Sequence, residues 1–201
     1  MDDNYDFPYD DTVDYSNYYF FDREFSKAEI AKIHTLAKKY DFEVATTAKT
    51  SKEDKNLNTI RKSKIKWLPK NKDFHWLYNR VGKLIEEAND QLYKFDLTGM
   101  REDFQYTIYP KDAGHYDWHM DIGGPGIMTQ RKLSITIELT EHGVDYEGGL
   151  LQANLGNGLM DLPQGAGTAV LFPSFFVHRV TPVTKGERKS IVLWVGGNHY
   201  K

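Results

Sequence analysis

Residues 168–195 read TAVLFPSFFVHRVTPVTKGERKSIVLWV, and this stretch decides the fold. Apolar runs alternate in it with Pro, Ser, Thr and Gly residues, which predicts three strands, at Thr168–Phe172, Val177–Val180 and Arg188–Val195. The first and last runs are largely apolar on both faces, which is typical of strands that other layers cover on both sides. The stretch therefore predicts a sheet buried between two layers.

Toward the N-terminus, apolar positions keep the two-residue period of strands back to Asp103. This period predicts four more strands, at Phe104–Tyr109, Tyr116–Asp121, Leu133–Leu139 and Leu150–Ala153. Shorter strands are expected at Tyr18–Phe21 and Ile65–Leu68, and residues 46–64, which have few apolar anchors, are expected to form a loop or an irregular edge.

Two amphipathic helices are predicted before the main strands. Ser26 and Glu29 have the spacing of a capping box, and the helix that they open is expected to run to about Tyr40. Asp73 is expected to cap the second helix. Apolar residues recur in it at helical spacing: Phe74, Leu77, Tyr78, Val81, Leu84, Ile85 and Ala88. The predicted fold is α+β and mainly β, a double-stranded β-helix (jelly roll) with N-terminal helices packed on one sheet; composition alone does not separate it from other sandwiches.

The composition excludes several classes of protein. The chain has 201 residues and suits one domain, expected over residues 16–201 after an acidic, Tyr/Asp-rich tail (1–15) that we expect to be partly disordered. The absence of cysteine excludes disulfide scaffolds, Cys-ligated metals and thiol nucleophiles. A net charge of −3 argues against a nucleic-acid partner.

A long apolar run and a basic leader are both missing, so we expect a cytoplasmic protein with no membrane partner. The acidic tail could steer a Lys/Arg-rich partner, such as a ribosomal protein, toward the domain.

His119, Asp121 and His178 are the candidate metal ligands. Residues two apart in a strand project to one face, so His119 and Asp121 are expected to point together, and His178 is the best candidate for a third ligand. Two His and one carboxylate on one face of a metal are typical of non-haem Fe(II) oxygenases. A solvated strand face is the alternative interpretation of His-x-Asp alone. His115 is expected at a loop end rather than among the ligands.

Arg188 is the candidate for binding a cosubstrate carboxylate. A hairpin centred near Val183 would place Arg188 opposite His178, and a guanidinium there could bind the far carboxylate of a 2-oxo diacid. An ordinary strand-edge charge is the alternative. The Gly148-Gly149 pair either permits a close backbone approach near the site or forms a turn or bulge.

From about Phe104 to Gly196 the chain resembles the Fe(II)/2-oxoglutarate-dependent dioxygenases of the prolyl 4-hydroxylase-like branch. The matching features, in the family's order, are Tyr109-Pro110, Gly114 with Tyr116, His119-x-Asp121, Arg131 before Leu133-Ser134-Ile135-Thr136, Asp145-Tyr146-Glu147-Gly148-Gly149-Leu150, Leu162-Pro163-Gln164-Gly165, Phe172-Pro173-Ser174, His178 to Val183 and Gly186-x-Arg188. They cover nearly half of the chain, and the last of them are the most specific.

The resemblance implies roles for seven residues. The iron ligands would be His119, Asp121 and His178. The C5 carboxylate of 2-oxoglutarate would bind Arg188, and Tyr109 would contact the same cosubstrate. Tyr116 and Arg131 match positions that line the substrate groove in prolyl hydroxylases. The implied cofactors are Fe(II) and 2-oxoglutarate, with a role for ascorbate left open.

The implied activity is hydroxylation of an unactivated C–H bond with consumption of dioxygen and release of succinate and CO₂. The expected substrate is a prolyl or other residue in a peptide or protein. Two alternatives remain: a hydroxylase of a free amino acid or other small molecule, and a non-catalytic jelly-roll binding module.

Overall fold

The computed structural model describes residues 17–45, 57–124, 126–154 and 158–198. The acidic tail expected at residues 1–15 lies outside this part of the chain. Two helices, α1 (Lys27–Ala37) and α3 (His75–Ala88), precede most of the strands, and a single helical turn, α2 (Leu57–Ile60), lies between them. None of the described helices is long and apolar enough to cross a bilayer.

The strands form two main antiparallel sheets. The larger sheet has the order β1 (Tyr19–Phe21), β12 (Ala169–Pro173), β8 (Arg131–Glu138), β15 (Arg188–Gly197), β6 (Phe104–Tyr109), β4 (Lys64–Leu68) and β2 (Glu43–Val44), with β5 (Leu97–Gly99) paired to β15. The smaller sheet has the order β11 (Leu159–Asp161), β10 (Leu151–Asn154), β13 (Val177–Val180), β7 (His115–His119) and β3 (Arg61–Lys62). A two-stranded ribbon, β9 (Tyr146–Gly148) with β14 (Val183–Gly186), lies beside them.

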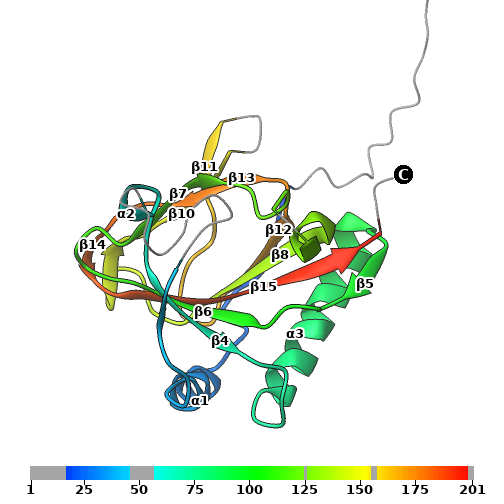
Figure 1. Cartoon of the computed structure of the whole chain (residues 1–201), viewed down its shortest axis with the longest axis horizontal. Helices are drawn as coiled ribbons and strands as arrows, with labels where there is room; N and C mark the ends of the chain where they lie inside the picture. The colour runs from blue at the N-terminus through cyan, green and yellow to red at the C-terminus, as the bar shows by residue number, and fades with distance from the viewer. Residues whose placement is uncertain (1–16, 46–56, 125, 155–157, 199–201) are drawn as a thin grey trace, which may run out of the picture.

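The molecule has three layers: the two helices, the larger sheet and the smaller sheet (Figure 1). One hydrophobic cluster joins α1 and α3 to the outer face of the larger sheet, where Ile191, Leu193 and Val195 of β15 are buried. A second cluster joins the inner faces of the two sheets through Val170 and Phe172 on one side and Leu151, Ala153 and Val180 on the other. The predicted double-stranded β-helix with helices on one sheet is confirmed.

The two predicted helix starts have different outcomes. Ser26 and Glu29 form the expected capping box, although α1 ends at Ala37. The prediction that Asp73 caps the second helix is wrong. The backbone N–H groups of Asp73 and Phe74 donate to the side-chain oxygen of Asn71, while the Asp73 carboxylate pairs with Lys39 at 2.8 Å.

The structure refines one prediction about strands and contradicts another. Residues 57–62, expected within a loop or irregular edge, form the single turn α2 and the edge strand β3 of the smaller sheet, whereas residues 46–56 lie outside the described chain. The hairpin expected near Val183 does not form, because β13 pairs with β7 and β10 in the smaller sheet and β15 pairs with β6 and β8 in the larger one. Strands β13 and β15 therefore lie in different sheets of the sandwich.

Candidate metal centre

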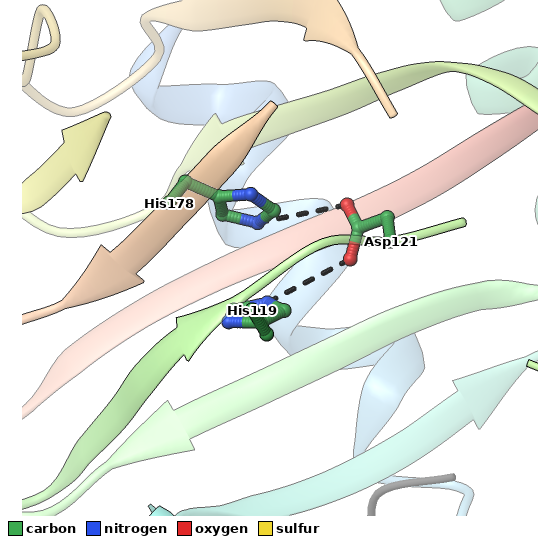
Figure 2. Close-up of side chains that lie close together, drawn as sticks. All are labelled: His119, Asp121 and His178. Atoms are coloured by element: carbon green, nitrogen blue, oxygen red, sulfur yellow. Dashed lines mark ion pairs between the residues drawn. The ribbon is translucent and has the colours of Figure 1, made fainter. Parts of the chain in front are cut away.

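His119, Asp121 and His178 converge at the inner face of the smaller sheet (Figure 2). One ligand atom from each residue lies within 4.8 Å of the other two. His119 Nε2 is 3.7 Å from Asp121 Oδ1, and His178 Nε2 is 3.6 Å from Asp121 Oδ2. Among the described residues, no other group of three His, Cys, Asp or Glu side chains has its ligand atoms this close together.

Strand pairing brings the two imidazoles together. His119 and His178 are direct partners across β7 and β13, and their ring centroids are 4.2 Å apart. Asp121 follows the end of β7 rather than lying within a strand, so the strand expected at Tyr116–Asp121 ends two residues early. The backbone N–H of Asp121 donates to the carbonyl of Ser174 at 2.9 Å, which fixes the carboxylate beside the strand end.

A bulge in β7 changes which side chain lies beside His119 on the same face of the sheet. The register of β7 against β13 shifts between the His119–His178 pair and the Tyr116–Val180 pair. Tyr116 consequently stacks on the His119 ring, with centroids 3.5 Å apart and planes 17° apart. The even spacing that would have put His115 on the face of His119 is broken, and the His115 ring contacts the carbonyls of Ala113 and Thr59 instead.

The orientation of both rings suits metal binding through Nε2. Nδ1 of His119 lies 2.7 Å from the carbonyl of Asp117, and Nδ1 of His178 lies 2.9 Å from the carbonyl of Phe176. Each carbonyl accepts a hydrogen bond only from a protonated Nδ1, so a neutral ring keeps its Nε2 lone pair toward Asp121. Burial and the nearby His178 lower the pKa of His119 to about 3, although Asp121 opposes the shift. His119 is thus neutral at physiological pH.

The Asp121 carboxylate is held in its ionised form. Its burial raises the pKa, but His178, His119 and the hydroxyl of Ser134 lower it more, so the net shift is downward. Ser134 donates to Oδ2 at 2.6 Å, and the indole of Trp194 adds to the same effect. A neutral imidazole and a carboxylate are the forms in which these groups bind a divalent metal, so the donor set fits Fe(II).

Arg188 faces the same interior from the larger sheet. Its side chain is 1% exposed, and its guanidinium lies 5.1 Å from the ring centroid of Tyr109, its partner across β6 and β15. Nε of Arg188 and Oγ of Ser190, the next residue on that face of β15, have no hydrogen-bond partner among the described residues. A buried donor without a partner fits a site that receives an anionic ligand.

The Gly148-Gly149 pair has both of the roles that the sequence offered as alternatives: a turn and a close approach of the backbone to the site. Gly148 and Gly149 have φ of 69° and 59°, and a Cβ at Gly149 would lie 3.2 Å from Cδ of Arg188. The chain therefore turns there and also approaches Arg188 closely.

The structure places Arg131 against the candidate metal ligand rather than in open solvent. Its guanidinium donates to the Glu102 carboxylate and, at 3.0 Å, to the carbonyl of Asp121, and it lies 3.7 Å from the ring centroid of Trp194. Its predicted contact with substrate stays a prediction.

The sequence interpretation missed three residues of this interior: Ser134, Glu138 and Glu102. A signal for the first two was present, because Ser134, Thr136 and Glu138 alternate with Leu133, Ile135 and Ile137 along β8. That alternation marks a polar face, and in the structure the polar face points toward the metal centre and Arg188.

Comparisons with known proteins add a sequence match and a shared fold. Residues 104–196 match the sequence model of the 2OG-Fe(II) oxygenase superfamily. A PKHD-type hydroxylase from Alteromonas mediterranea is 39% identical over 85 residues, which are 40% of this chain and 37% of the relative. A PKHD-type hydroxylase from Sphingopyxis alaskensis is 36% identical over 127 residues, 59% of this chain and 56% of the relative. The chain therefore spans about half or less of the length of these relatives.

Solved structures share the fold. A prolyl hydroxylase from Trichoplax adhaerens, in complex with a peptide fragment of a hypoxia-inducible factor, has a TM-score of 0.73 at 20% identity, with 90% of this chain and 84% of that one covered. A prolyl-4-hydroxylase from Pseudomonas putida has a TM-score of 0.67 at 21% identity, with 91% and 94% covered. In sequence, residues 104–196 are thus similar to the 2OG-Fe(II) oxygenase superfamily, and the chain shares its fold with solved prolyl hydroxylases.

Proposed function

We propose that the chain is an Fe(II)- and 2-oxoglutarate-dependent hydroxylase that acts on a prolyl or other residue of a peptide or protein. The observation that carries the proposal is the placement of two charged sites in one interior. The His119–Asp121–His178 cluster comes from the smaller sheet, and the buried Arg188 faces it from the larger sheet.

In this proposal each residue has a separate task. His119 and His178 offer Nε2 and Asp121 offers a carboxylate oxygen to Fe(II), and Arg188 binds the C5 carboxylate of 2-oxoglutarate beside Tyr109. The chemistry supplied by the bound metal is the oxidation of 2-oxoglutarate by dioxygen to succinate and CO₂, coupled to hydroxylation of the substrate. The protein's own part is to orient the ligands through the backbone carbonyls at Nδ1 and to keep water from the Arg188 end of the interior.

The peptide part of the proposal rests on the comparison with solved structures. The fold is shared with the Trichoplax adhaerens enzyme, which was solved with a peptide, and this supports a peptide substrate here.

The test is succinate formation by the purified chain with Fe(II), 2-oxoglutarate and a panel of substrates. Stimulation by proline-containing peptides, with a product heavier by one oxygen atom, supports the proposal. Stimulation by free amino acids alone supports the small-molecule alternative. His119→Ala is expected to abolish turnover, whereas His75→Ala, at an exposed position on α3, is the matched control. A chain that forms no succinate and shows no charge-transfer absorption with Fe(II) and 2-oxoglutarate under anaerobic conditions would be a binding module.

A further inference from the structure

A second carboxylate already lies on Arg188. Glu138 of β8 and Arg188 of β15 are each 1% exposed, and the Arg188 guanidinium donates to Oε1 of Glu138. Glu138 is the direct partner of Ser190 across the two strands, so it projects from the same inner face as Arg188. The two side chains form a buried ion pair at the position proposed for the cosubstrate's distal carboxylate.

This pair is incompletely satisfied. Nε of Arg188 and Oε2 of Glu138 have no hydrogen-bond partner among the described residues. Tyr109, Tyr146 and Gly149 surround the guanidinium, and Gly149 approaches its Cδ so closely that a methyl group there would crowd it. Arg188 therefore has a donor available for a second anion without moving away from Glu138.

Charge balance sets what a second anion would do. One guanidinium and one carboxylate are close to neutral together, whereas a further carboxylate would leave a net negative charge in the interior, which is costly. Protonation of Glu138 removes that excess negative charge. It is favoured there, because a buried carboxyl group beside a like charge prefers its neutral form.

Resting on the proposed function, we propose that Glu138 is the resident counter-ion of Arg188 and takes up one proton from solvent when a 2-oxo diacid binds. The protonated carboxyl can then donate a hydrogen bond to the incoming carboxylate or to a neighbouring oxygen. Glu138 thereby lowers the preference of the pocket for a diacid over a 2-oxo monoacid.

The surroundings of Glu138 agree with a carboxyl group that gains a proton readily. Burial raises its pKa, and Arg188 and His142 oppose that shift. The other titratable groups around the pair are Tyr109 and Tyr146, which stand next to Arg188, and burial raises the pKa of Tyr146 well above its ordinary value. When a second anion binds Arg188, Arg188 lowers the pKa of Glu138 less strongly, and the pKa of Glu138 rises.

The test is calorimetric titration of the Mn(II)-loaded full chain with 2-oxoglutarate near pH 7.5 in buffers of different ionisation enthalpy. The wild-type chain is expected to take up about one proton per 2-oxoglutarate and none with 2-oxopentanoate, which lacks the distal carboxylate. Glu138→Gln should abolish the uptake and bind 2-oxoglutarate about tenfold more tightly. Glu147→Gln removes a carboxylate from the exposed pair with Lys185 and is the matched control, expected to behave as wild type.

The outcomes separate this inference from the proposed function. If wild type binds 2-oxoglutarate without proton uptake, or if Glu138→Gln leaves both affinity and uptake unchanged, Glu138 has no such role while the oxygenase proposal stands. If 2-oxoglutarate does not bind the metal-loaded chain at all, the proposed function itself fails. The wild-type titration decides the point even if the variant does not fold.

Discussion

The hydroxyl of Ser134 donates a hydrogen bond of 2.6 Å to Oδ2 of Asp121, across the two sheets of the sandwich. Ser134 lies in β8 of the larger sheet, whereas Asp121 follows β7 of the smaller one. Ser174, whose hydroxyl is 3.0 Å from that of Ser134, also holds the backbone of Asp121 through its carbonyl. The candidate carboxylate ligand is thus fixed by the opposite sheet as well as by its own strand.

Removing this hydroxyl is expected to weaken metal binding. Ser134→Ala removes the 2.6 Å hydrogen bond to the Asp121 carboxylate. Loss of such a partner typically costs 10–100-fold in metal affinity, so we expect about that loss here. The measurement is anaerobic titration with Fe(II) or Mn(II). Ser134→Thr keeps a hydroxyl and should retain most of the affinity.

Ser190→Ala is the matched control for this prediction, because the Ser190 hydroxyl on the neighbouring strand has no hydrogen-bond partner among the described residues. It should bind the metal as wild type does. Equal affinity of Ser134→Ala and wild type would contradict the role given to Ser134.

The sequence predicted most of the scaffold because the main elements have strong local patterns. The apolar stripe from Leu77 to Ala88 became the buried face of α3, and the continuous apolar run of β15 is covered on both sides. The three candidate ligands were also predicted as a set, and the structure brings them together. Short strands of two to four residues, such as β3 and β14, carry too few residues for a period to be visible.

The errors came from pairings between distant segments. The turn-rich residues between His178 and Arg188 suggested a hairpin, but the chain crosses there from one sheet to the other. The bulge in β7 is likewise set by pairing with β13, so no local pattern shows that Tyr116, rather than His115, accompanies His119. The polar face of β8 is visible in the sequence, but its burial between the sheets is a property of the tertiary fold.

The Arg188–Glu138 pair should behave as a buried ion pair in unfolding experiments. Arg188→Met leaves a buried carboxylate without its partner, which is expected to lower the free energy of unfolding of the metal-free chain by about 3–5 kcal/mol. The double variant Arg188→Met, Glu138→Met removes both charges and should recover most of that loss. Urea denaturation measures both.

The exposed pair of Lys185 and Glu147, 2.9 Å apart, is the control for the buried one. Lys185→Met should change the free energy of unfolding by less than about 1 kcal/mol. If Arg188→Met lowers the free energy of unfolding no more than Lys185→Met does, burial of the Arg188–Glu138 pair does not contribute to stability.

His34 should make the metal-free chain less stable as the pH falls. It lines a cavity of about 210 Å³ with Lys38, Lys66 and Lys189, and its Nδ1 lies 3.0 Å from the hydroxyl of Tyr106. Burial, followed by the charges of Lys189 and Lys38, lowers its pKa below the ordinary value of 6.5. Below that value the unfolded chain binds a proton that the folded chain does not, so acid favours unfolding, by at most about 1.4 kcal/mol for each pH unit.

His34→Gln should therefore reduce the fall in the free energy of unfolding between pH 7 and pH 5, measured by urea denaturation at each pH. The same substitution at the exposed His75 controls for the loss of an imidazole. A slope that is unchanged in His34→Gln would show that its ring does not titrate differently in the folded and unfolded chains.

Gly149 should be needed both for the turn and for the shape of the Arg188 site. Its φ is 59°, and a Cβ added there would lie 2.9 Å from Cγ2 of Val183 and 3.2 Å from Cδ of Arg188. Gly143, with φ of 80°, has no atom within 4 Å of such a Cβ, so Gly143→Ala measures the backbone strain alone, about 1 kcal/mol. Gly149→Ala adds crowding to that strain, so it should lower the free energy of unfolding by about 1–3 kcal/mol more than Gly143→Ala does.

Because the added methyl group presses on Arg188, Gly149→Ala should also weaken binding of 2-oxoglutarate to the metal-loaded chain, while Gly143→Ala should leave it unchanged. Affinity for the metal itself should be the same in both variants, since Gly149 contacts Arg188 and not the candidate ligands. Titration with Mn(II) and then with 2-oxoglutarate separates the two effects. Equal losses of cosubstrate affinity in Gly149→Ala and Gly143→Ala would mean that the close approach of the backbone to Arg188 does not shape the cosubstrate site.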